Sequence, residues 1–350
     1  MHNTAQIHAV DLFCGAGGLS YGLRQAGIAI AAGIDIDTHC QYAFEANLGA
    51  KFIKKDIREV SPSELAALYP KTGIRLLAGC APCQPFSSHR RGADTSKDEK
   101  WTLLDEFSRL IRGVLPELVT MENVPRLANT EMFESFTSML EENGYSYAYR
   151  NCFGPQYGLA QERRRLVLVA SRLGKIDTPI PVRKASDYRT VRDALEKLPA
   201  LNAGESDKND PLHRARSLTP INLARLEASK PGGTWEDWPE YLRAPCHKRK
   251  TGATFRSVYA RMSWDTPAPT ITTQAYNFGT GRFGHPEQNR SITLREAAIL
   301  QGFPKKYKFV QSKEDVQFST LGRLIGNAVP PPLAKAIGKQ LVAHAEEFGL

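Results

Sequence analysis

The chain has 350 residues, of which 41% are hydrophobic, and its formal net charge is +9. A chain of this length can bury a full hydrophobic core as one large domain or as two. No stretch approaches the ~20 consecutive apolar residues of a membrane span, and residues 1–10 lack the basic and apolar regions of a signal peptide. We therefore expect a cytoplasmic protein without a membrane partner, and the basic charge favours a polyanionic ligand.

The first half of the chain alternates short apolar runs with segments of helical spacing. Runs typical of buried parallel strands occupy residues 8–13, 28–34, 75–78, 118–121 and 166–170. Apolar residues at helical spacing fill the intervals, at residues 19–26, 43–47, 64–68, 103–114 and 131–143. This alternation predicts the α/β class, with a doubly wound and mostly parallel sheet.

The pattern changes after Lys175, where segments interrupted by Pro and Gly begin. We predict a catalytic and cofactor-binding domain over residues 1–175 and a second, smaller and irregular domain over residues 176–290. Residues 291–350 form a return segment, with helices predicted at 291–300 and 332–347. The last of these helices is expected to complete the first domain.

A glycine-rich loop follows the first predicted strand, in the sequence Asp11-Leu12-Phe13-Cys14-Gly15-Ala16-Gly17-Gly18. Glycines let the backbone turn tightly and approach a ligand. Asp35 ends the next strand, about 20 residues on, where it could accept hydrogen bonds from ribose hydroxyls, and Asp56 follows the third strand. Such a turn can also join a strand to a helix without binding anything, and a dinucleotide oxidoreductase is a competing interpretation. The loop lacks the G-x-G-x-x-G spacing, which favours a nucleotide-like cofactor without a pyrophosphate.

Two cysteines, Cys80 and Cys83, follow the strand that ends at Ala78. They lie at the carboxyl edge of the predicted sheet, where open α/β folds place their active sites, so both are candidate nucleophiles. The C-x-P-C spacing also fits a thiol redox protein, although Pro85 disfavours the helix that a redox site needs directly after its thiol. No second cysteine pair accompanies them, so no metal is expected. The remaining cysteines are interpreted as buried small hydrophobes: Cys14, Cys40, Cys152 and Cys246.

A carboxylate follows the next predicted strand, because residues 118–121 run directly into Glu122. Glutamates at strand ends are usually solvated. Glu122, however, shares a sheet edge with a candidate nucleophile and a cofactor loop, so a thiol and a carboxylate are expected to face one pocket.

Taken in order, these segments resemble the motifs of the DNA (cytosine-5) methyltransferases. The resemblance covers roughly the first 175 residues and the last 60, and it rests on residues 11–20, 79–88, 122–124, 161–165, 290–304 and 326–330. It implies the class I S-adenosylmethionine-dependent methyltransferase fold, S-adenosyl-L-methionine as methyl donor and double-stranded DNA as partner. The second domain would then be the DNA-recognition domain.

The resemblance also implies a role for each matching residue. Cys83 is the expected nucleophile, which adds to carbon 6 of a flipped-out cytosine so that carbon 5 can accept the methyl group. Glu122 would act at ring nitrogen 3 and Arg165 at the base oxygen, with Arg163 in the same catalytic set. The residues expected to bind the cofactor are Phe13, Gly15, Gly17, Gly18, Asp35, Ile36, Asp56, Ile57, Leu103, Asn327 and Val329. Ile36 departs from the family, which often has a large aromatic residue at that position.

DNA contacts are expected from two regions. Residues 84–100 resemble the mobile active-site loop of the family, although an ordinary solvated loop is the alternative; the candidates there are Gln84, Ser87, His89, Arg90 and Arg91. Residues 241–264 carry six basic side chains, including Arg261, and no acid, which predicts a phosphate-facing surface. The candidates in this middle region are Arg243, Lys248, Arg249, Lys250, Arg256, Thr270 and Thr272.

A tRNA cytosine methyltransferase would share the motifs before Lys175, so it stays an alternative. We favour DNA because a middle region of this size suits the recognition of a duplex. A non-catalytic relative would be expected to lose the thiol or the carboxylate, and both are present. We expect a monomer of the restriction-modification type, associated with the nucleoid, with a separately acting restriction endonuclease as a candidate partner.

Overall fold

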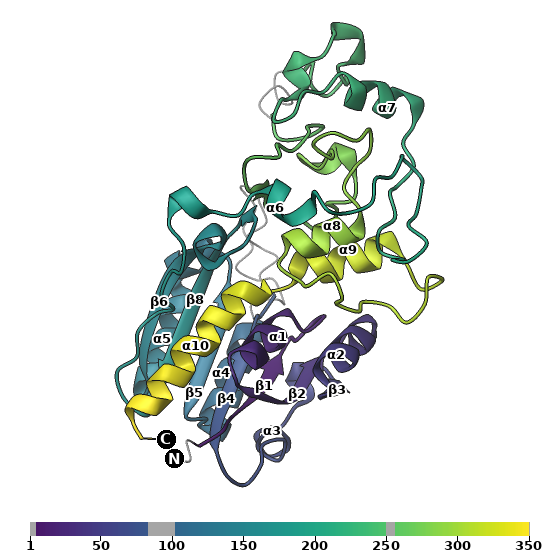
Figure 1. Cartoon of the computed structure of the whole chain (residues 1–350). Helices are drawn as coiled ribbons and strands as arrows, with labels where there is room; N and C mark the ends of the chain where they lie inside the picture. The colour runs from purple at the N-terminus through teal and green to yellow at the C-terminus, as the bar shows by residue number, and fades with distance from the viewer. Residues whose placement is uncertain (1–4, 83–101, 250–255, 350) are drawn as a thin grey trace. The chain divides into compact units, whose positions relative to one another are not determined.

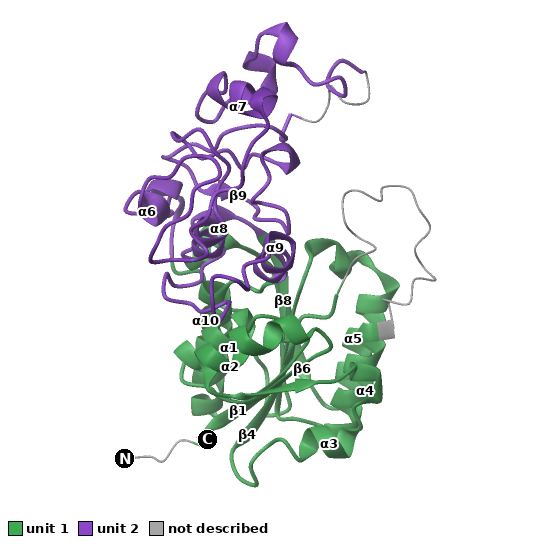
Figure 2. Ribbon diagram, turned by 90° about the vertical axis from the view of Figure 1, so that its right-hand side faces the viewer, with its two compact units in different colours: residues 1–157, 164–182, 328–350 green, residues 158–163, 183–327 purple. Residues whose placement is uncertain are grey.

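The computed structural model describes residues 5–82, 102–249 and 256–349, and it consists of two compact units (Figures 1 and 2). Unit 1 comprises Met1–Tyr157, Arg164–Val182 and Ala328–Leu350. Unit 2 comprises Gly158–Arg163 and Arg183–Asn327. The chain therefore leaves unit 1 twice and returns to it twice. Residues 291–327, which we grouped by sequence with the return segment, cluster with unit 2.

Unit 1 is built on a seven-stranded sheet of order β3-β2-β1-β4-β5-β8-β6. The neighbours among β1 to β5 pair in parallel, whereas β8 runs antiparallel to both β5 and β6. This confirms the predicted α/β class with a doubly wound, mostly parallel sheet. The strands are β1 (Ile7–Leu12), β2 (Ala29–Asp35), β3 (Lys51–Lys54), β4 (Ile74–Gly79), β5 (Leu118–Asn123), β6 (Ser146–Phe153) and β8 (Arg164–Ser171).

The sheet of unit 1 separates two hydrophobic cores, because successive side chains of a strand point to opposite faces. In β1, for example, Val10 and Leu12 enter one core, while Ile7 and Ala9 enter the other. The first core is covered by α3 (Pro62–Ala66), α4 (Thr102–Val114) and α5 (Glu131–Glu142). The second is covered by α1 (Gly18–Gln25) and α10 (Pro331–Glu347), while α2 (Gln41–Leu48) precedes β3 (Figure 1).

Helices α1 and α10 pack closely because a glycine on each removes a side chain from the contact. A Cβ at Gly22 of α1 would collide with the Ala334 Cβ and the Pro331 carbonyl of α10. A Cβ at Gly338 of α10 would lie 2.6 Å from the Ala26 Cβ, just after α1. The two ends of the chain therefore meet in one face of unit 1, and α1 carries the glycine loop at its N-terminus.

Unit 2 contains short elements joined by irregular segments. These elements are β7 (Gln161–Glu162), β9 (Ala268–Pro269), α6 (Val191–Leu195), α7 (Pro220–Glu227), α8 (Leu294–Leu300) and α9 (Phe318–Asn327). A small cluster that includes Trp235, Trp238 and Phe278 forms a hydrophobic core near α7. Polar contacts also fill the interior, since Arg290 and Glu296 are fully buried and form an ion pair at 2.7 Å. Such a pair persists in a core only when its geometry is good and its other atoms are bonded.

All five predicted strands and all seven predicted helices are present in the structure, with shifts of a few residues at their ends. Strands β6, β7 and β9 and helices α6, α7 and α9 were not predicted from the sequence, and β3 was expected before Asp56 without bounds. In the part of the chain that the structure describes, no helix combines the length and the apolar character needed to cross a bilayer.

Candidate active site

The glycine loop turns between β1 and α1 through residues of left-handed backbone. Phe13, Gly15 and Gly17 have φ angles of 58°, 50° and 84°. Glycine adopts this conformation without strain, which explains its use at two of the three positions. The Gly17 amide donates to the Cys14 carbonyl at 2.9 Å and closes the turn. A Cβ at Gly15 would meet no described atom within 4 Å, so space is open above the loop.

Asp35 holds this loop from the end of β2. Its Oδ2 accepts from the Gly15 amide at 2.8 Å, and its Oδ1 accepts from the Asp37 amide at 2.9 Å. Burial raises the pKa of Asp35, and the two amides oppose that shift. Asp35 thus lies beside the loop and is bound to it, while the predicted contact of its carboxylate with a ribose stays a prediction. Ile36 beside it is 62% exposed, which is unusual for an isoleucine.

The other residues expected at the cofactor lie in varied settings. Asp56 is bound by Arg58, whose Nε lies 3.0 and 3.1 Å from its two oxygens, and this hydrogen bonding lowers the pKa of Asp56. Ile57 is buried and Leu103 is partly buried, both in the core on the α4 face. Val329 is buried in the core beneath α10. Asn327 is exposed at the end of α9, within unit 2.

Asp11 is a buried carboxyl group that the sequence analysis did not select. Its Oδ2 accepts from the Ser20 hydroxyl at 2.6 Å, which ties β1 to α1 across the glycine loop. Its Oδ1 has no hydrogen-bond partner among the described residues. Burial raises the pKa of Asp11 to about 7; the Ser20 hydrogen bond opposes the shift and the charge of Asp35 adds to it. Its position in the motif, beside the glycine loop, was the signal that could have revealed it.

Glu122 lies in β5, between two side chains from neighbouring strands. The Cys80 thiol, just after β4, donates to its Oε2 at 3.0 Å. Arg165 in β8 places its Nε 3.0 Å from Oε1, although no donor of a described residue is aligned for a hydrogen bond to that oxygen. The glutamate side chain is only 3% exposed. A buried carboxylate oxygen without an aligned donor is costly unless a ligand completes it.

The segment that leads to Cys83 is anchored to the same strand. Asn123 donates from its Nδ2 to the Ala81 carbonyl at 3.1 Å, and its Oδ1 accepts from the Val124 amide at 2.7 Å. The motif residues after Glu122 therefore fix the backbone two residues before Cys83. Cys83 itself lies outside the described residues, as do Gln84, Ser87, His89, Arg90, Arg91 and Lys250.

Arg163 has a different environment from Arg165. Its side chain is 3% exposed, and its two terminal nitrogens donate to the Ile271 and Gly326 carbonyls, both at 3.1 Å. Gln161 makes similar contacts, accepting from the Ile271 amide at 2.9 Å and donating to the Leu300 carbonyl at 3.0 Å. These bonds hold unit 2 together. The catalytic role expected for Arg163 stays a prediction.

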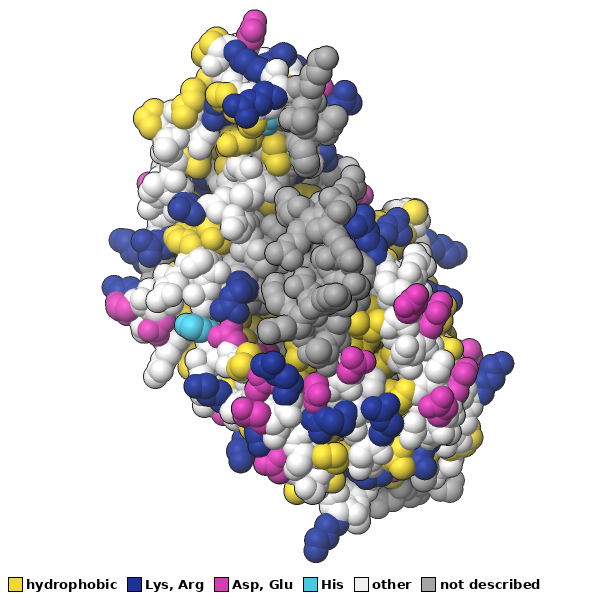
Figure 3. All heavy atoms as spheres, turned by 180° about the vertical axis from the view of Figure 1, so that it is seen from behind, with side chains coloured by type: hydrophobic (Ala, Val, Ile, Leu, Met, Phe, Trp, Pro, Cys, Tyr) yellow, Lys and Arg dark blue, Asp and Glu magenta, His cyan; other side chains and the backbone are white. Residues whose placement is uncertain are grey.

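The basic run of the middle region is only partly available for phosphates. Arg256 is 69% exposed but lies 3.2 Å from Glu236, and exposed Lys248 lies 3.9 Å from Glu240. Arg243 donates to the Glu236 carbonyl at 3.0 Å, and Arg249 is exposed. In Figure 3, basic side chains gather beside hydrophobic ones towards the α7 end of unit 2.

Two expectations for this region were wrong. Arg261 is 4% exposed, and its guanidinium donates to the carbonyls of Leu226, Ser229, His285 and Gln288, so it stabilises the interior and faces no phosphate. Cys246, predicted to be buried, is an exposed free thiol. The partners of Arg261 are neutral: these backbone carbonyls and the side-chain oxygen of Asn289, none of which stands out in the sequence as a partner for an arginine.

Thr270 and Thr272 belong to a segment that pairs with the Gln161 strand. The Thr270 hydroxyl donates to the Glu162 carbonyl at 2.6 Å, whereas Thr272 is exposed. Thr272 is therefore the more accessible of the two residues expected to approach DNA.

Comparison of the sequence with known families gives a match along almost the whole chain. The model of the C-5 cytosine-specific DNA methylase family matches residues 7–343. Type II methylase M.HgiDII from Herpetosiphon aurantiacus is 48% identical over 340 residues, which cover 96% of this chain and 95% of the relative. Type II methyltransferase M1.HphI from Haemophilus parahaemolyticus is 30% identical over 341 residues, covering 95% and 86%.

Solved structures show the same fold at lower identity. A methyltransferase encoded within an E. coli prophage has a TM-score of 0.72 and 22% identity, covering 96% of this chain and 98% of that one. The Dnmt2 methyltransferase of S. pombe has a TM-score of 0.67 and 19% identity, covering 99% and 100%.

Proposed function

The chain belongs to the C-5 cytosine-specific DNA methylase family, and from this membership we propose how its own residues carry out the methylation of cytosine in DNA. The family match agrees with the resemblance found in the motifs. The relatives named Type II methylases favour a restriction-modification enzyme acting on DNA over a tRNA methyltransferase or a thiol redox protein. The observation that carries the proposal is buried Glu122, held by Cys80 and Arg165 with one oxygen still lacking an aligned donor.

We propose that S-adenosyl-L-methionine is the methyl donor and that the glycine loop holds it. The loop fits such a group, because it combines left-handed glycines, open space above Gly15 and the buried carboxylate of Asp35. Asp35 would receive ribose hydroxyls, and Phe13 would lie against the adenine. When bound, the donor would supply a methyl group on a positively charged sulfur. This sulfur is a good leaving group because it becomes a neutral thioether.

The chain's residues would activate the cytosine. Carbon 5 is a weak nucleophile until a thiolate adds to carbon 6, and this is the role we assign to Cys83. The negative charge that develops on the ring would be met at nitrogen 3 by Glu122 and at the base oxygen by Arg165. After methylation, a base takes the proton from carbon 5, the double bond between carbons 5 and 6 forms again, and Cys83 leaves as a thiolate. The cytosine must leave the duplex to reach these groups, at an unstacking cost of a few kcal/mol.

In this scheme Cys80 and Arg165 position Glu122. The thiol occupies Oε2, and the arginine lies against Oε1, so the carboxylate has one orientation. Oε1 is then the atom that faces the base.

Unit 2 would recognise the target sequence. We propose that the protein acts as a monomer at the nucleoid beside a separate endonuclease.

The reaction is tested by expressing the chain in a methylation-free host and sequencing the DNA after bisulfite treatment. We expect protected cytosines in one short sequence, which would also reveal the target. Cys83→Ser should abolish covalent trapping on 5-fluorocytosine DNA while DNA binding remains. Trapping that survives in Cys83→Ser would exclude this nucleophile.

The role of Glu122 is tested with a matched glutamate of the same region. Glu122→Gln should slow methyl transfer by about 10²- to 10⁴-fold, because the acid is lost while the shape is kept. Glu117→Gln, which removes an ion pair with Arg75 at the other end of β5, should leave the rate near the wild-type value. Equal rates in the two variants would remove Glu122 from the mechanism.

A further inference from the structure

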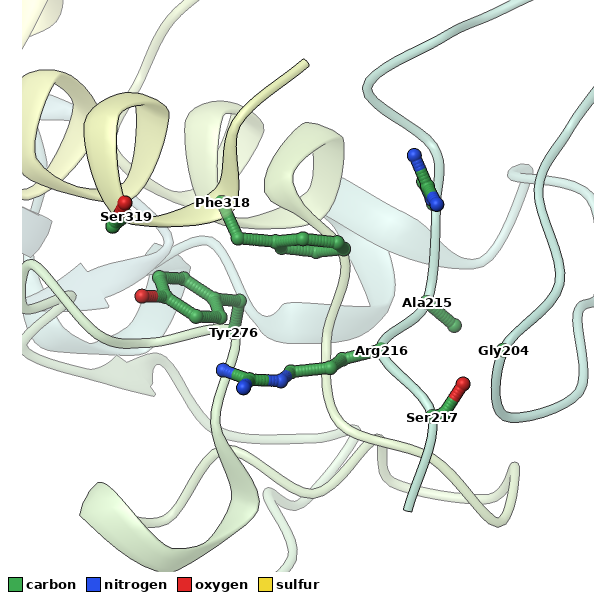
Figure 4. Close-up of a pocket in the computed structure, with 8 residues that line it drawn as sticks. Gly204, Ala215, Arg216, Ser217, Tyr276, Phe318 and Ser319 are labelled. Atoms are coloured by element: carbon green, nitrogen blue, oxygen red, sulfur yellow. The ribbon is translucent and has the colours of Figure 1, made fainter.

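Unit 2 contains an open cavity of about 550 Å³ that none of the expected site residues line. It lies between residues 204–217, which precede α7, the segment before η10 (Phe278–Thr280) and the start of α9 (Figure 4). The side chains that line it include Arg214, Arg216, Ser217, Tyr276, Phe318 and Ser319.

Two arginines and two aromatic rings contact one another in a row in this cavity. The Arg216 guanidinium lies 5.7 Å from the centre of the Tyr276 ring, which in turn lies 5.3 Å from the centre of the Phe318 ring. Arg214 lies 5.8 Å from the centre of the Phe318 ring. Figure 4 shows Phe318, Tyr276 and the Arg216 side chain lying one beneath another. Cation–π contacts of this kind hold an arginine in place without neutralising its charge.

The positive charge of the cavity is not balanced by carboxylates. None of its lining residues is acidic, and neither arginine takes part in an ion pair with the described residues. Arg216 is fixed by a neutral group, donating from Nη1 to Asn277 Oδ1 at 2.6 Å. Glu205, next to the lining residue Gly204, accepts from the Asn202 amide and side chain at 2.7 and 3.1 Å. Asp210, the acid nearest in sequence to the two arginines, forms an ion pair with Arg295 at 2.6 Å.

We propose that this cavity binds a phosphate group of the DNA backbone. Its walls offer hydrogen-bond donors and positive charge, from two planar guanidinium groups and the hydroxyls of Ser217 and Ser319. Arginine is the side chain best suited to a phosphate, because its fork can bind two oxygens at once. The helix α9 begins at Phe318, so its dipole adds positive potential at the cavity.

The cavity is joined to the segment expected to approach DNA. Asn277, which binds Arg216, donates to Gln274 Oε1 at 3.4 Å. The Thr280 hydroxyl donates to the Gln274 carbonyl at 2.8 Å. Residues 270–274 and the cavity therefore form one continuous part of unit 2, and a phosphate bound at Arg216 would fix that segment on the duplex. Phosphate contacts position a protein on DNA without selecting the sequence.

This inference rests on the proposed function, because it takes DNA as the ligand. The test compares the wild type with the double variant Arg214→Ala/Arg216→Ala in binding to a duplex of mixed sequence, over a range of salt concentrations. We expect about five- to tenfold weaker binding and a slope of log affinity against log salt smaller by about 1. Arg216→Lys, which keeps the charge but loses the fork, should lie between the two.

Lys197→Ala is the matched control, since it removes an exposed charge of unit 2 that does not line the cavity. It should bind DNA as the wild type does. Binding of S-adenosylhomocysteine should be equal in all variants, which shows that unit 1 is intact. Wild-type DNA affinity and salt slope in the double variant would overturn the proposal.

Two further outcomes are informative. One outcome is that inorganic phosphate or a nucleoside monophosphate binds the wild type at micromolar concentration but does not bind the double variant, while both proteins bind DNA equally. The cavity would then bind a small ligand, and its assignment to DNA would be wrong. If the wild type methylates no DNA, the proposed function fails. If it does methylate DNA while the double variant binds DNA normally, only this inference fails.

Discussion

At the scale of single residues, the two oxygens of Glu122 have unequal surroundings, because Cys80 donates a hydrogen bond to Oε2 while Oε1 has no aligned donor among the described residues. A thiol is a weak hydrogen-bond donor, yet at 3.0 Å from Oε2 it determines which oxygen stays open. A serine hydroxyl could replace it as a donor, whereas alanine could not. The environment of the carboxylate thus depends on a residue outside the expected catalytic set.

We predict that Cys80→Ala lowers kcat about tenfold with little change in KM for DNA, because an orienting hydrogen bond of about 1 kcal/mol is lost where alignment matters. Cys80→Ser should recover most of the rate. Steady-state methyl transfer of both variants, with thermal unfolding as a check on folding, measures this. Equal kcat values for the serine and alanine variants would show that the hydrogen bond has no positioning role.

Asp11 predicts a pH dependence of stability. Its pKa is about 7 in the folded protein and near 3.8 in an unfolded chain, so the folded state binds the proton more tightly. This group therefore contributes its full stability below about pH 4, and that contribution falls as the pH rises towards 7. Asp11→Asn should flatten the dependence of the melting temperature on pH between pH 5 and 8. The melting temperature of this variant should exceed that of the wild type most at pH 8. An unchanged profile would show that Asp11 is ionised throughout.

At the scale of elements, the sequence predicted what periodicity and turn chemistry control. The glycine loop, Asp35 and the edge that carries Cys80 and Glu122 followed from strand ends in a parallel sheet. Strand β6 was missed because it is an edge strand with a mostly exposed face, so its apolar and polar residues follow no buried pattern. Helices α6 and α7 are short elements of unit 2, where polar contacts such as those of Arg261 and Gln161 contribute to the interior. Helix α9 does have buried apolar residues at helical spacing, Leu321, Leu324 and Ile325, and this pattern was overlooked.

The positions of the candidate residues were predictable to the same extent. The sequence placed Asp35 and Glu122 at strand ends, where the structure also has them. The contact of Asp11 with Ser20 was missed because the hydrogen bond that links them depends on how α1 packs on β1. Asp56 was selected as a ligand residue, and the structure shows it bound by Arg58, a partner two residues away. Tertiary contacts of this kind have no sequence spacing that marks them.

The contact of α1 with α10 gives the prediction at this scale. Gly22→Ala should destabilise the protein by about 1–3 kcal/mol, because the added methyl would meet the Ala334 side chain and the Pro331 backbone and would force the helices apart. Gln25→Ala, on the exposed side of the same helix, is the control and should be neutral. Urea unfolding of both variants measures the difference. A stable Gly22→Ala would mean that the helices can separate at little cost.

At the scale of the whole molecule, the net charge of +9 and the division into two units predict different responses to salt. DNA affinity should fall steeply from 50 to 200 mM salt, because phosphate contacts release counterions. The cofactor, which carries little net charge and would bind in unit 1, should not respond in this way. We expect the melting temperature shift given by S-adenosylhomocysteine to vary little over this range. Calorimetric titration at several salt concentrations tests both parts, and parallel losses of the two affinities would contradict the prediction.

The packing of α1 against α10 also constrains the order of events during synthesis. The apolar residues Leu19 and Leu23 of α1 belong to a core that includes Leu333, Ile337 and Leu341, from the last helix of the chain. While the ribosome makes the intervening 300 or so residues, this surface has no permanent cover. The core contacts of the helix that carries the glycine loop can then be completed only after α10 has been synthesised. A chain truncated before α10 should therefore aggregate after its release from the ribosome and should not methylate DNA. Host DNA would then be modified only by molecules that include α10.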